Sequence, residues 1–185
     1  RSRVADFWGT GAVADGPGLK AVDMFEAVHR GDIRVIWIMG TNPAVSLPDS
    51  ARVREALARC PTVIVSDCVA HTDTTDLADI LLPAAGWGEK DGTVTNSERR
   101  ISRQRCFLPL PAEVKPDWWI MSSVAGKLGF GEAFNYKRPA DIFREHAALS
   151  AHENNGERLF NLAGLVNLSD PGYDTLQPVQ WPILG

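Results

Sequence analysis

The 185-residue sequence contains only three cysteines, and they lie far apart. An odd number of scattered cysteines predicts no disulfide framework and favours a reducing compartment. Positive charge is not in excess either, because 19 lysines and arginines face 23 acidic residues. General binding to nucleic acid or to an anionic membrane requires a basic face, so we expect neither kind of binding. No apolar run approaches the roughly 18 residues that span a bilayer, and no signal peptide is recognisable, so we expect a cytoplasmic protein without membrane insertion.

The composition that remains is that of a globular protein. Hydrophobic residues make up 44% and charged residues 23%, enough for one sizeable α/β domain. The sequence begins at Arg1 without an initiator methionine and ends on a Pro-containing stretch that is typical of a linker. We therefore expect the chain to be a fragment of a longer polypeptide.

Strand and helix patterns alternate in the first half of the chain. Residues 34–39 form a β-branched apolar run that predicts a strand buried on both faces, and residues 62–65 and 80–82 predict two more strands. Helices are expected over residues 19–29 and after a cap at Asp49 or Ser50. A strand, helix and strand within a short span form a βαβ unit, which builds a parallel sheet with right-handed crossovers.

The remaining segments carry weaker signals. Residues 1–18 are rich in glycine and are expected to be irregular, as are residues from Ser150 onward. Asp91-Gly92 predicts a turn. Helices are expected to open at Pro116 and Pro139, since proline favours the first helical position.

Polar residues follow two of the predicted strands directly. Thr41-Asn42-Pro43 follows the first strand and Ser66-Asp67 the second. In open parallel sheets ligands bind at the carboxyl ends of the strands, where an acid can accept hydrogen bonds from ribose hydroxyls or a base amino group. The alternative is that Asp67 caps the next segment and Asn42 only turns the chain.

Other motifs give no catalytic assignment. Residues 9–14 match a dinucleotide fingerprint, but no strand precedes them and Asp15-Gly16-Pro17 breaks the helix that the motif needs. No phosphate-binding loop is present, and the four histidines lack metal-ligand spacing with any cysteine. We therefore predict neither a metal site nor a catalytic residue in this chain.

The loop over residues 89–100 concentrates charge. It holds cations, hydroxyls and an amide, and Arg103 and Arg105 follow it. Such a loop can grip phosphates through charge-assisted hydrogen bonds. The alternative interpretation, which these residues alone favour, is a solvated hairpin held by ion pairs.

Six segments taken together, in order and spacing, resemble the molybdopterin oxidoreductase family, whose members carry a bis-molybdopterin guanine dinucleotide cofactor. The six segments are VIWIMGTNP (35–43), VIVSD (63–67), ADILLP (78–83), WGEKDGT (87–93), NSERR (96–100) and KPDWW (115–119). Within the family the chain is most similar to assimilatory nitrate reductase catalytic subunits, a likeness that extends to VADFWG (4–9), FREH (143–146) and PVQWP (178–182).

The resemblance implies a fold and a set of cofactor contacts. It implies the family's third domain, a doubly wound α/β domain with a mostly parallel sheet and flanking helices, which cups one guanine dinucleotide. The implied division is an irregular segment (1–18), the dinucleotide-binding domain (19–150), and an extension and linker (151–185). Arg99 and Arg100 are further candidates for contact. Carried over residue by residue, the implied cofactor-binding residues are Asn42, Ser66, Asp67, Lys90 and Asp117.

The resemblance also implies what lies outside this chain. Family members hold an iron–sulfur cluster through an N-terminal cysteine run, and neither that run nor the molybdenum ligand occurs here. The implied partners are the molybdopterin guanine dinucleotide, the remaining domains of the same polypeptide, and an electron donor protein or subunit. The parent would then reduce nitrate to nitrite, and the fragment alone would be inactive. Alternatives are another family member, such as a formate dehydrogenase, or a structural domain like that in the large iron–sulfur subunit of NADH dehydrogenase.

Overall fold

The computed structural model describes residues 1–111 and 113–184, which form two compact units. We name each unit after its sheet. The parallel-sheet unit comprises Pro17–Glu89 and Leu108–Val124, and the antiparallel-sheet unit comprises Arg1–Gly16, Lys90–Phe107 and Ala125–Gly185. This grouping differs from the three-part division after residues 18 and 150, which stays a prediction.

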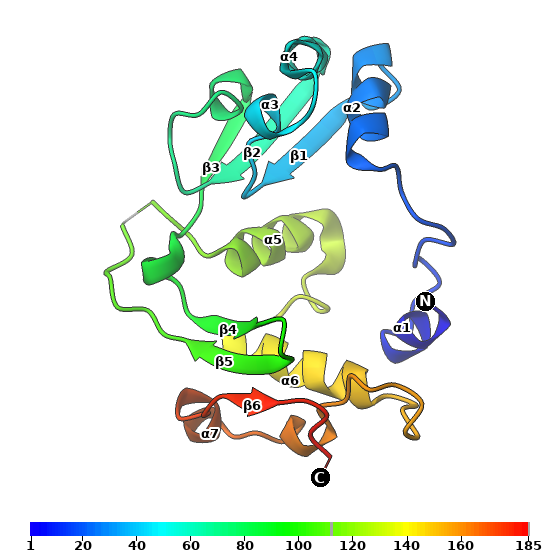
Figure 1. The fold of residues 1–185 in the computed structure, drawn as a ribbon, viewed down its shortest axis with the longest axis vertical. Helices are drawn as coiled ribbons and strands as arrows, with labels where there is room; N and C mark the ends of the chain where they lie inside the picture. The colour runs from blue at the N-terminus through cyan, green and yellow to red at the C-terminus, as the bar shows by residue number, and fades with distance from the viewer. Residues whose placement is uncertain (112, 185) are drawn as a thin grey trace. The chain divides into compact units, whose positions relative to one another are not determined.

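The parallel-sheet unit is built on three strands, β1 (Val35–Met39), β2 (Thr62–Asp67) and β3 (Ile80–Pro83). They pair in parallel in the order β1-β2-β3, and their arrowheads in Figure 1 end at one edge of the sheet. The predicted α/β class, with a parallel sheet and flanking helices, is confirmed.

Helices α2 (Ala21–Arg30) and α4 (Ser50–Arg59) flank this sheet. Helix α4 begins where predicted, because the Asp49 side chain accepts a hydrogen bond from the Arg52 backbone N–H over 3.2 Å. Helix α2 ends at Gly31, whose φ of +85° is a conformation that favours glycine.

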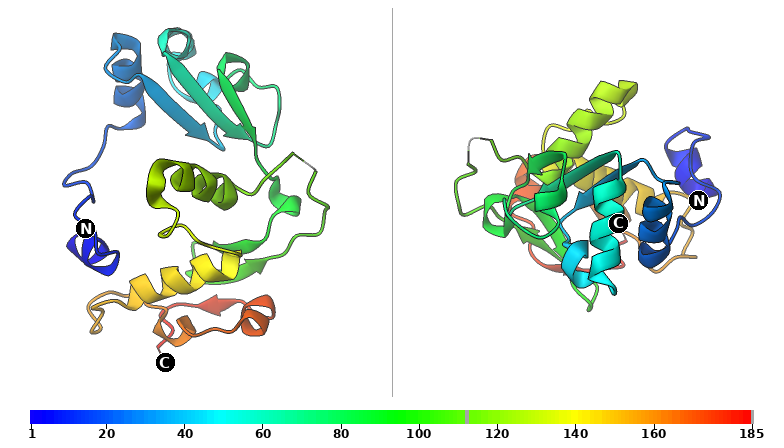
Figure 2. Two further views of the ribbon diagram at one scale, coloured as in Figure 1. Left: turned by 180° about the vertical axis from the view of Figure 1, so that it is seen from behind. Right: turned by 90° about the horizontal axis from the view of Figure 1, so that it is seen from above.

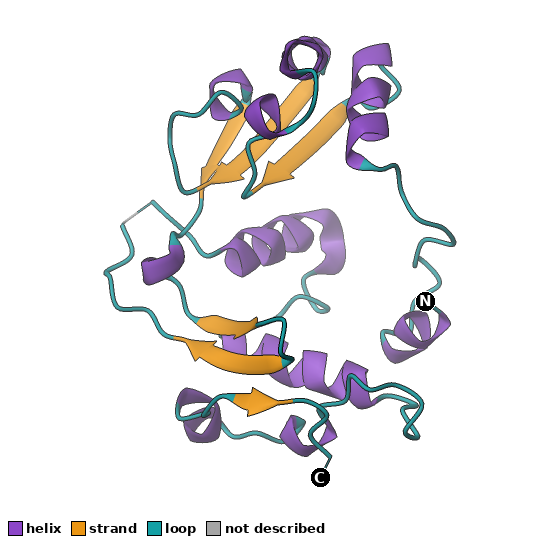
Figure 3. Cartoon of the chain, in the orientation of Figure 1, coloured by secondary structure: helices purple, strands orange, loops and turns teal. Residues whose placement is uncertain are grey.

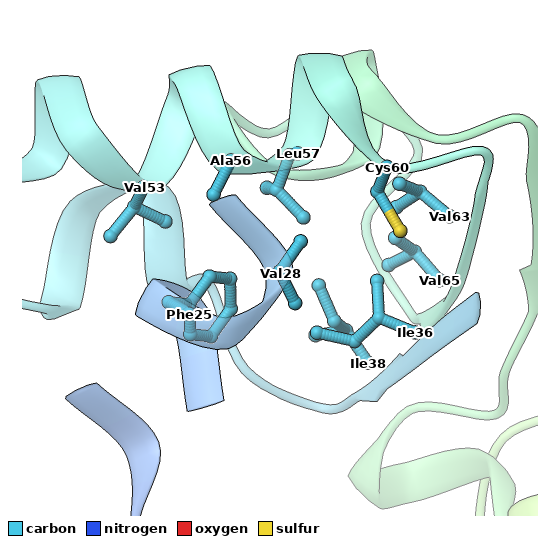
Figure 4. Close-up of a cluster of buried hydrophobic side chains, with 10 residues drawn as sticks. All are labelled: Phe25, Val28, Ile36, Ile38, Val53, Ala56, Leu57, Cys60, Val63 and Val65. Atoms are coloured by element: carbon cyan, nitrogen blue, oxygen red, sulfur yellow. The ribbon is translucent and has the colours of Figure 1, made fainter. Parts of the chain in front are cut away.

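Both helices pack on one face of the sheet. Ile36 and Ile38 of β1 point into this core, whereas Val35 is 59% exposed. The prediction that β1 is buried on both faces is therefore wrong for this chain, because α2 and α4 cover only the face that bears Ile36 and Ile38. The core, drawn in Figure 4, consists of Phe25, Val28, Ile36, Ile38, Val53, Ala56, Leu57, Cys60, Val63 and Val65.

Shorter elements lie near the carboxyl ends of the strands. Helix α3 (Pro43–Ser46) follows β1, and η1 (Thr75–Leu77) follows β2. The 3₁₀ turn η2 (Trp87–Glu89) follows β3. Helix α5 (Asp117–Ala125) opens after Pro116, as predicted, and η3 (Gly126–Phe130) continues from it.

The antiparallel-sheet unit contains β4 (Gly92–Thr95), β5 (Arg100–Gln104) and β6 (Val179–Gln180), paired in that order. The orange arrows of Figure 3 show β4 and β5 as a hairpin, which is the alternative interpretation of this charged segment. The predicted turn at Asp91-Gly92 is wrong, because the chain turns after β4. There the Asn96 side chain accepts hydrogen bonds from two backbone N–H groups across the turn.

Segments that were expected to be irregular contain helices in this unit. These are α1 (Ser2–Phe7), η4 (Ala163–Leu165) and α7 (Asp170–Asp174), beside the predicted helix α6 (Pro139–Ala151). None of the described helices is long and apolar enough to cross a membrane. The unit's core consists of Ile101, Ala140, Phe143, Ala147, Leu162, Leu165, Tyr173 and Leu176.

The N-terminus of α6 predicts a pH effect on stability. The Asp141 carboxylate accepts from the backbone N–H groups of Lys137 and Arg138, over 2.8 and 3.1 Å, and pairs with Arg144. The Lys137 backbone hydrogen bond is the main cause that lowers the pKa of Asp141 below its ordinary value, and the Arg138 and Arg144 interactions add to it. A lowered folded-state pKa contributes stability above about pH 4, and this contribution disappears as the pH falls through the lowered value.

We therefore expect Asp141→Ala to lower the free energy of unfolding by about 1 kcal/mol at pH 7. The difference from wild type should shrink steadily below pH 4, where wild type loses the same interaction. Urea unfolding of both proteins at pH 7, 4 and 3 measures this. A difference that stays constant across that range would mean that the Asp141 charge contributes nothing.

Candidate functional site

The carboxyl ends of the three parallel strands gather polar side chains at one sheet edge. Met39 pairs with Ser66, and Asp67 pairs with Pro83, so the strands end level with one another. The Gly40 backbone N–H donates to the Ser66 carbonyl over 3.0 Å, which extends the pairing past β1. Figure 2, left, shows the ends of the three strands from behind. Among the described strands the order does not reverse, so the residues share a carboxyl edge and not a switch point.

Asn42 lies at this edge just before α3, and its side chain is fixed. The Asn42 Oδ1 atom accepts a hydrogen bond from the Thr74 hydroxyl over 2.6 Å. The same Thr74 oxygen accepts from the Ala44 backbone N–H over 3.1 Å. Thr74 is fully buried, whereas Asn42 is half-buried.

Ser66 is placed differently, because its side chain is fully buried. Its hydroxyl oxygen accepts a hydrogen bond from the Trp37 indole N–H over 2.9 Å. Trp37 itself is only half-buried. The buried Ser66 hydroxyl therefore anchors the half-buried indole ring of Trp37.

Asp67 ends β2 and is half-buried. One carboxylate oxygen, Oδ1, accepts from the Val69 backbone N–H over 2.9 Å, which is the turn-forming role that the alternative interpretation assigned to it. No residue in the described part of the chain bonds its second oxygen, Oδ2. The carboxylate can therefore form the turn and still accept from a ligand.

Asp117 reaches the same edge from a distant part of the sequence. Lys115 forms a parallel bridge with Ala84, and its backbone N–H donates to the Pro83 carbonyl over 3.1 Å. This places residue 115 beside the end of β3, and Asp117 begins α5 two residues later. A shallow cavity of about 280 Å³ lies between β3 and α5, with Trp119 on its wall.

Lys90 and the further candidates Arg99 and Arg100 belong to the antiparallel-sheet unit. Lys90 is half-buried, and the Arg99 guanidinium lies 5.4 Å from the centre of the Trp181 ring. The structure thus brings four of the five predicted residues to one sheet edge. Those four are Asn42, Ser66, Asp67 and Asp117.

Two residues of this edge were missed by sequence reasoning. Trp37 falls in the strand predicted over residues 34–39, and Thr74 was assigned no role. The available signal was the apolar run itself, because an indole N–H in a strand that is otherwise apolar needs an acceptor. For Thr74 no local signal exists, since Asn42 lies 32 residues away.

A second group of polar side chains also went unpredicted. Ligand atoms of Asp6, His152 and Glu153 lie within 4.8 Å of one another on the antiparallel-sheet unit. The His152 ring pairs with the Asp6 carboxylate over 2.8 Å, and Glu153 pairs with Arg3. These ion pairs at the protein surface explain why the three side chains lie close together.

Residues 2–127 match the family model of the molybdopterin oxidoreductases. The chain belongs to the molybdopterin oxidoreductase family. The match covers the whole parallel-sheet unit, including the edge that carries Asn42, Ser66, Asp67 and Asp117.

Similarity to individual proteins agrees with this membership. A nitrate reductase of Klebsiella oxytoca is 58% identical over 181 residues, which are 98% of this chain and 21% of that protein. The F420-dependent formate dehydrogenase subunit alpha of Methanocaldococcus jannaschii is 44% identical over 128 residues, 69% of this chain and 19% of that protein. The chain therefore spans about a fifth of the length of these members of the molybdopterin oxidoreductase family.

A solved structure supports the fold. Acetylene hydratase from Pelobacter acetylenicus matches with a TM-score of 0.61 and 18% sequence identity. The match covers 73% of this chain and 19% of that protein. At this identity the likeness shows a shared fold.

Proposed function

We propose that the full-length protein is a molybdenum-dependent nitrate reductase and that this chain holds one guanine dinucleotide of its bis-molybdopterin guanine dinucleotide cofactor. The observation that carries the proposal is the extent of the nitrate reductase likeness. It reaches 58% identity over 98% of the chain, whereas the similar formate dehydrogenases are 37–44% identical over 69–80% of it. The nitrate reductase likeness therefore extends over nearly the whole chain, at a higher identity than the formate dehydrogenase likeness.

The chemistry of the sheet edge fits the nucleotide part of such a cofactor. A guanine base presents N–H donors on one edge and oxygen and nitrogen acceptors elsewhere. Asp67 has a carboxylate oxygen to accept from guanine or ribose donors, and Asn42 has amide N–H groups to donate. Asp117, at the start of α5, is the second acceptor for the guanine edge.

Ser66 and Lys90 take different parts in the proposal. Because the Ser66 hydroxyl is buried against Trp37, we assign it the role of holding the indole ring at the binding edge. Lys90 supplies the positive charge that offsets phosphate or pterin charge.

The bound molybdenum cofactor would supply the redox chemistry, a two-electron transfer to nitrate with two protons that yields nitrite and water. This chain's residues contribute binding and orientation: they hold the nucleotide end and so fix the cofactor in place. Electrons would arrive through an iron–sulfur cluster from a donor protein or subunit. The ligands of that cluster, and those of molybdenum, would come from other domains of the same polypeptide.

A second candidate function is formate oxidation. It is favoured by the formate dehydrogenase of Methanocaldococcus jannaschii, which is 44% identical over 128 residues. A non-catalytic structural domain is the third possibility, and the retained polar side chains at Asn42, Asp67 and Asp117 argue against it. A domain that had lost its nucleotide would have no use for an acceptor such as the unbonded oxygen of Asp67.

We also propose a cytoplasmic location. Cys60 and Cys68 are free thiols in the structure. Free thiols persist in a reducing compartment.

The proposal is tested on the purified full-length protein. Its molybdenum content is measured, and the same sample is assayed for nitrate-dependent oxidation of a reduced viologen dye and for formate-dependent dye reduction. We expect molybdenum together with nitrate turnover. A sample that contains molybdenum but turns over only formate would make the protein a formate dehydrogenase instead of a nitrate reductase. Iron without molybdenum would identify the non-catalytic structural domain.

A further inference from the structure

We propose that Thr74 is a positioning residue of the cofactor site, which fixes the Asn42 side chain so that its amide nitrogen faces the ligand. The inference rests on the proposed function, since it takes Asn42 as a cofactor contact. It adds a residue that no motif identified, and it specifies the chemistry of the contact. Asn42 then acts as a donor to an acceptor atom of the nucleotide.

The first step is the direction of the hydrogen bond between Thr74 and Asn42. The Thr74 oxygen accepts from the Ala44 backbone N–H, which can only donate. The hydroxyl proton remains available, and the distance of 2.6 Å to the Asn42 oxygen is typical of O–H···O and short for N–H···O. Thr74 therefore donates to Asn42 Oδ1, and this bond orients the side-chain amide.

The second step concerns the other half of the amide. With Oδ1 turned toward Thr74, Asn42 Nδ2 lies on the opposite side of the group. Within residues 1–111 and 113–184 no acceptor bonds to Nδ2, and the atom is not enclosed. Asn42 does not use its side chain to cap α3 either. Its two N–H groups are therefore available to a ligand at the sheet edge.

The third step is the rigidity of the support. The neighbouring residue Asp73 forms an ion pair of 2.6 Å with Arg54 of α4, and that pairing lowers the pKa of Asp73. Residues 72 and 75 bond to each other through backbone and hydroxyl groups, and the Thr74 carbonyl accepts from the Leu77 backbone N–H over 3.1 Å. Thr74 thus projects from a segment that is tied to the core helix α4.

These contacts give the edge a complementary pair of groups. Asn42 presents donors after β1, and the free oxygen of Asp67 presents an acceptor at the end of β2. The ligand group facing Asn42 must then be an acceptor, such as a phosphate or carbonyl oxygen. A support that holds the amide before the ligand arrives lowers the entropic cost of binding.

A double-mutant cycle tests the role of Thr74 in the full-length, cofactor-loaded protein. The variants are Thr74→Val, Asn42→Ala and the pair together, with Thr74→Ser as the control that keeps the hydroxyl. The readout is the rate at which each protein loses molybdenum and pterin in dilute urea below its unfolding midpoint. Metal analysis and the fluorescence of the oxidised pterin follow this loss after desalting.

We expect Thr74→Val to speed the loss about fivefold, the effect of one oriented hydrogen bond. The same change should have a smaller effect in the Asn42→Ala background, where only the bond from the Ala44 backbone N–H is left to lose. Thr74→Ser should keep the wild-type rate. An equal acceleration by Thr74→Val in both backgrounds would reduce Thr74 to a structural role and overturn the inference.

Two further outcomes separate this inference from the proposed function. If Asn42→Ala leaves the rate unchanged, Asn42 is no cofactor contact, and the site assignment fails together with the inference. If Asn42→Ala accelerates the loss and Thr74→Val does not, only the inference fails.

Should Thr74→Val not fold, Asn42→Asp takes its place. This variant keeps the hydrogen bond from Thr74 and replaces the outward N–H groups of Asn42 by an acceptor. Wild-type retention by that variant would contradict an outward donor, and accelerated loss would support it.

Discussion

Replacing Asp67 by alanine in the full-length protein is expected to weaken cofactor binding by about 10- to 100-fold. The substitution removes the carboxylate oxygen that is open to the ligand at the end of β2. Hydrogen bonds to a charged acceptor contribute about 1.5–3 kcal/mol, which corresponds to that range. Molybdenum content after purification, and its rate of loss on dilution, measure the effect.

The control for this prediction lies at the opposite edge of the same sheet. Asp32 precedes β1, is exposed and pairs with Arg30 over 2.9 Å. Asp32→Ala removes one acidic group from the same unit and should leave the molybdenum content unchanged. Equal, unchanged content in the Asp67 and Asp32 variants would favour the structural domain without a nucleotide over the proposed cofactor site.

The second large effect is expected at Arg103 of β5, which organises the antiparallel-sheet unit. Its side chain is only 3% exposed, and it pairs with Asp91 over 2.8 Å. It also donates to the Tyr173 carbonyl over 2.9 Å, and its guanidinium lies 4.1 Å from the centre of the Tyr173 ring. One side chain therefore joins β5 to the start of β4 and to α7.

We expect Arg103→Met to destabilise this unit by about 3 kcal/mol, because Met keeps much of the volume and leaves buried acceptors without their donor. Hydrogen exchange at the backbone amides of β4 and β5 measures the free energy of local opening. The matched control is Arg105→Met. Arg105 is exposed and donates to the Asp174 carbonyl over 3.0 Å, so its loss should change the free energy of local opening by at most about 0.5 kcal/mol.

An Arg103→Met protein that opens no more readily than the Arg105→Met control would contradict this account of the unit. A uniform rise in exchange over both units would mean that the damage is not confined to the hairpin. The expected pattern is a rise at β4 and β5 with unchanged exchange in β1 and β2.

Local sequence patterns were sufficient for the parallel sheet. The apolar runs of β1 and β2, the cap at Asp49 and the glycine after α2 are signals carried by neighbouring residues, and the structure places each element within a few residues of its prediction. Contacts between distant residues were not predictable in this way. Strand β6 pairs with β5 across about 80 residues, and its two-residue length leaves no period to detect.

The same distinction between local patterns and distant contacts applies to the residues of the candidate site. Asn42 and Asp67 were recognisable because each lies at or shortly after the end of an apolar strand run, where a polar side chain meets the carboxyl edge. The burial of Ser66 was not recognisable, since it depends on the Trp37 indole across the β1–β2 pair. The support of Asn42 by Thr74 likewise depends on how the segment after β2 returns to the end of β1.

The central claim is that the carboxyl edge of the parallel sheet binds the guanine nucleotide of a molybdenum cofactor. The most direct test compares hydrogen exchange in cofactor-loaded and cofactor-free full-length protein, with the nucleotide released from the loaded sample identified by mass spectrometry. We expect guanosine monophosphate in proportion to molybdenum, and slower exchange in peptides that cover residues 40–44 and 66–70. Equal exchange at both peptides, with protection confined to other parts of the polypeptide, would contradict the claim.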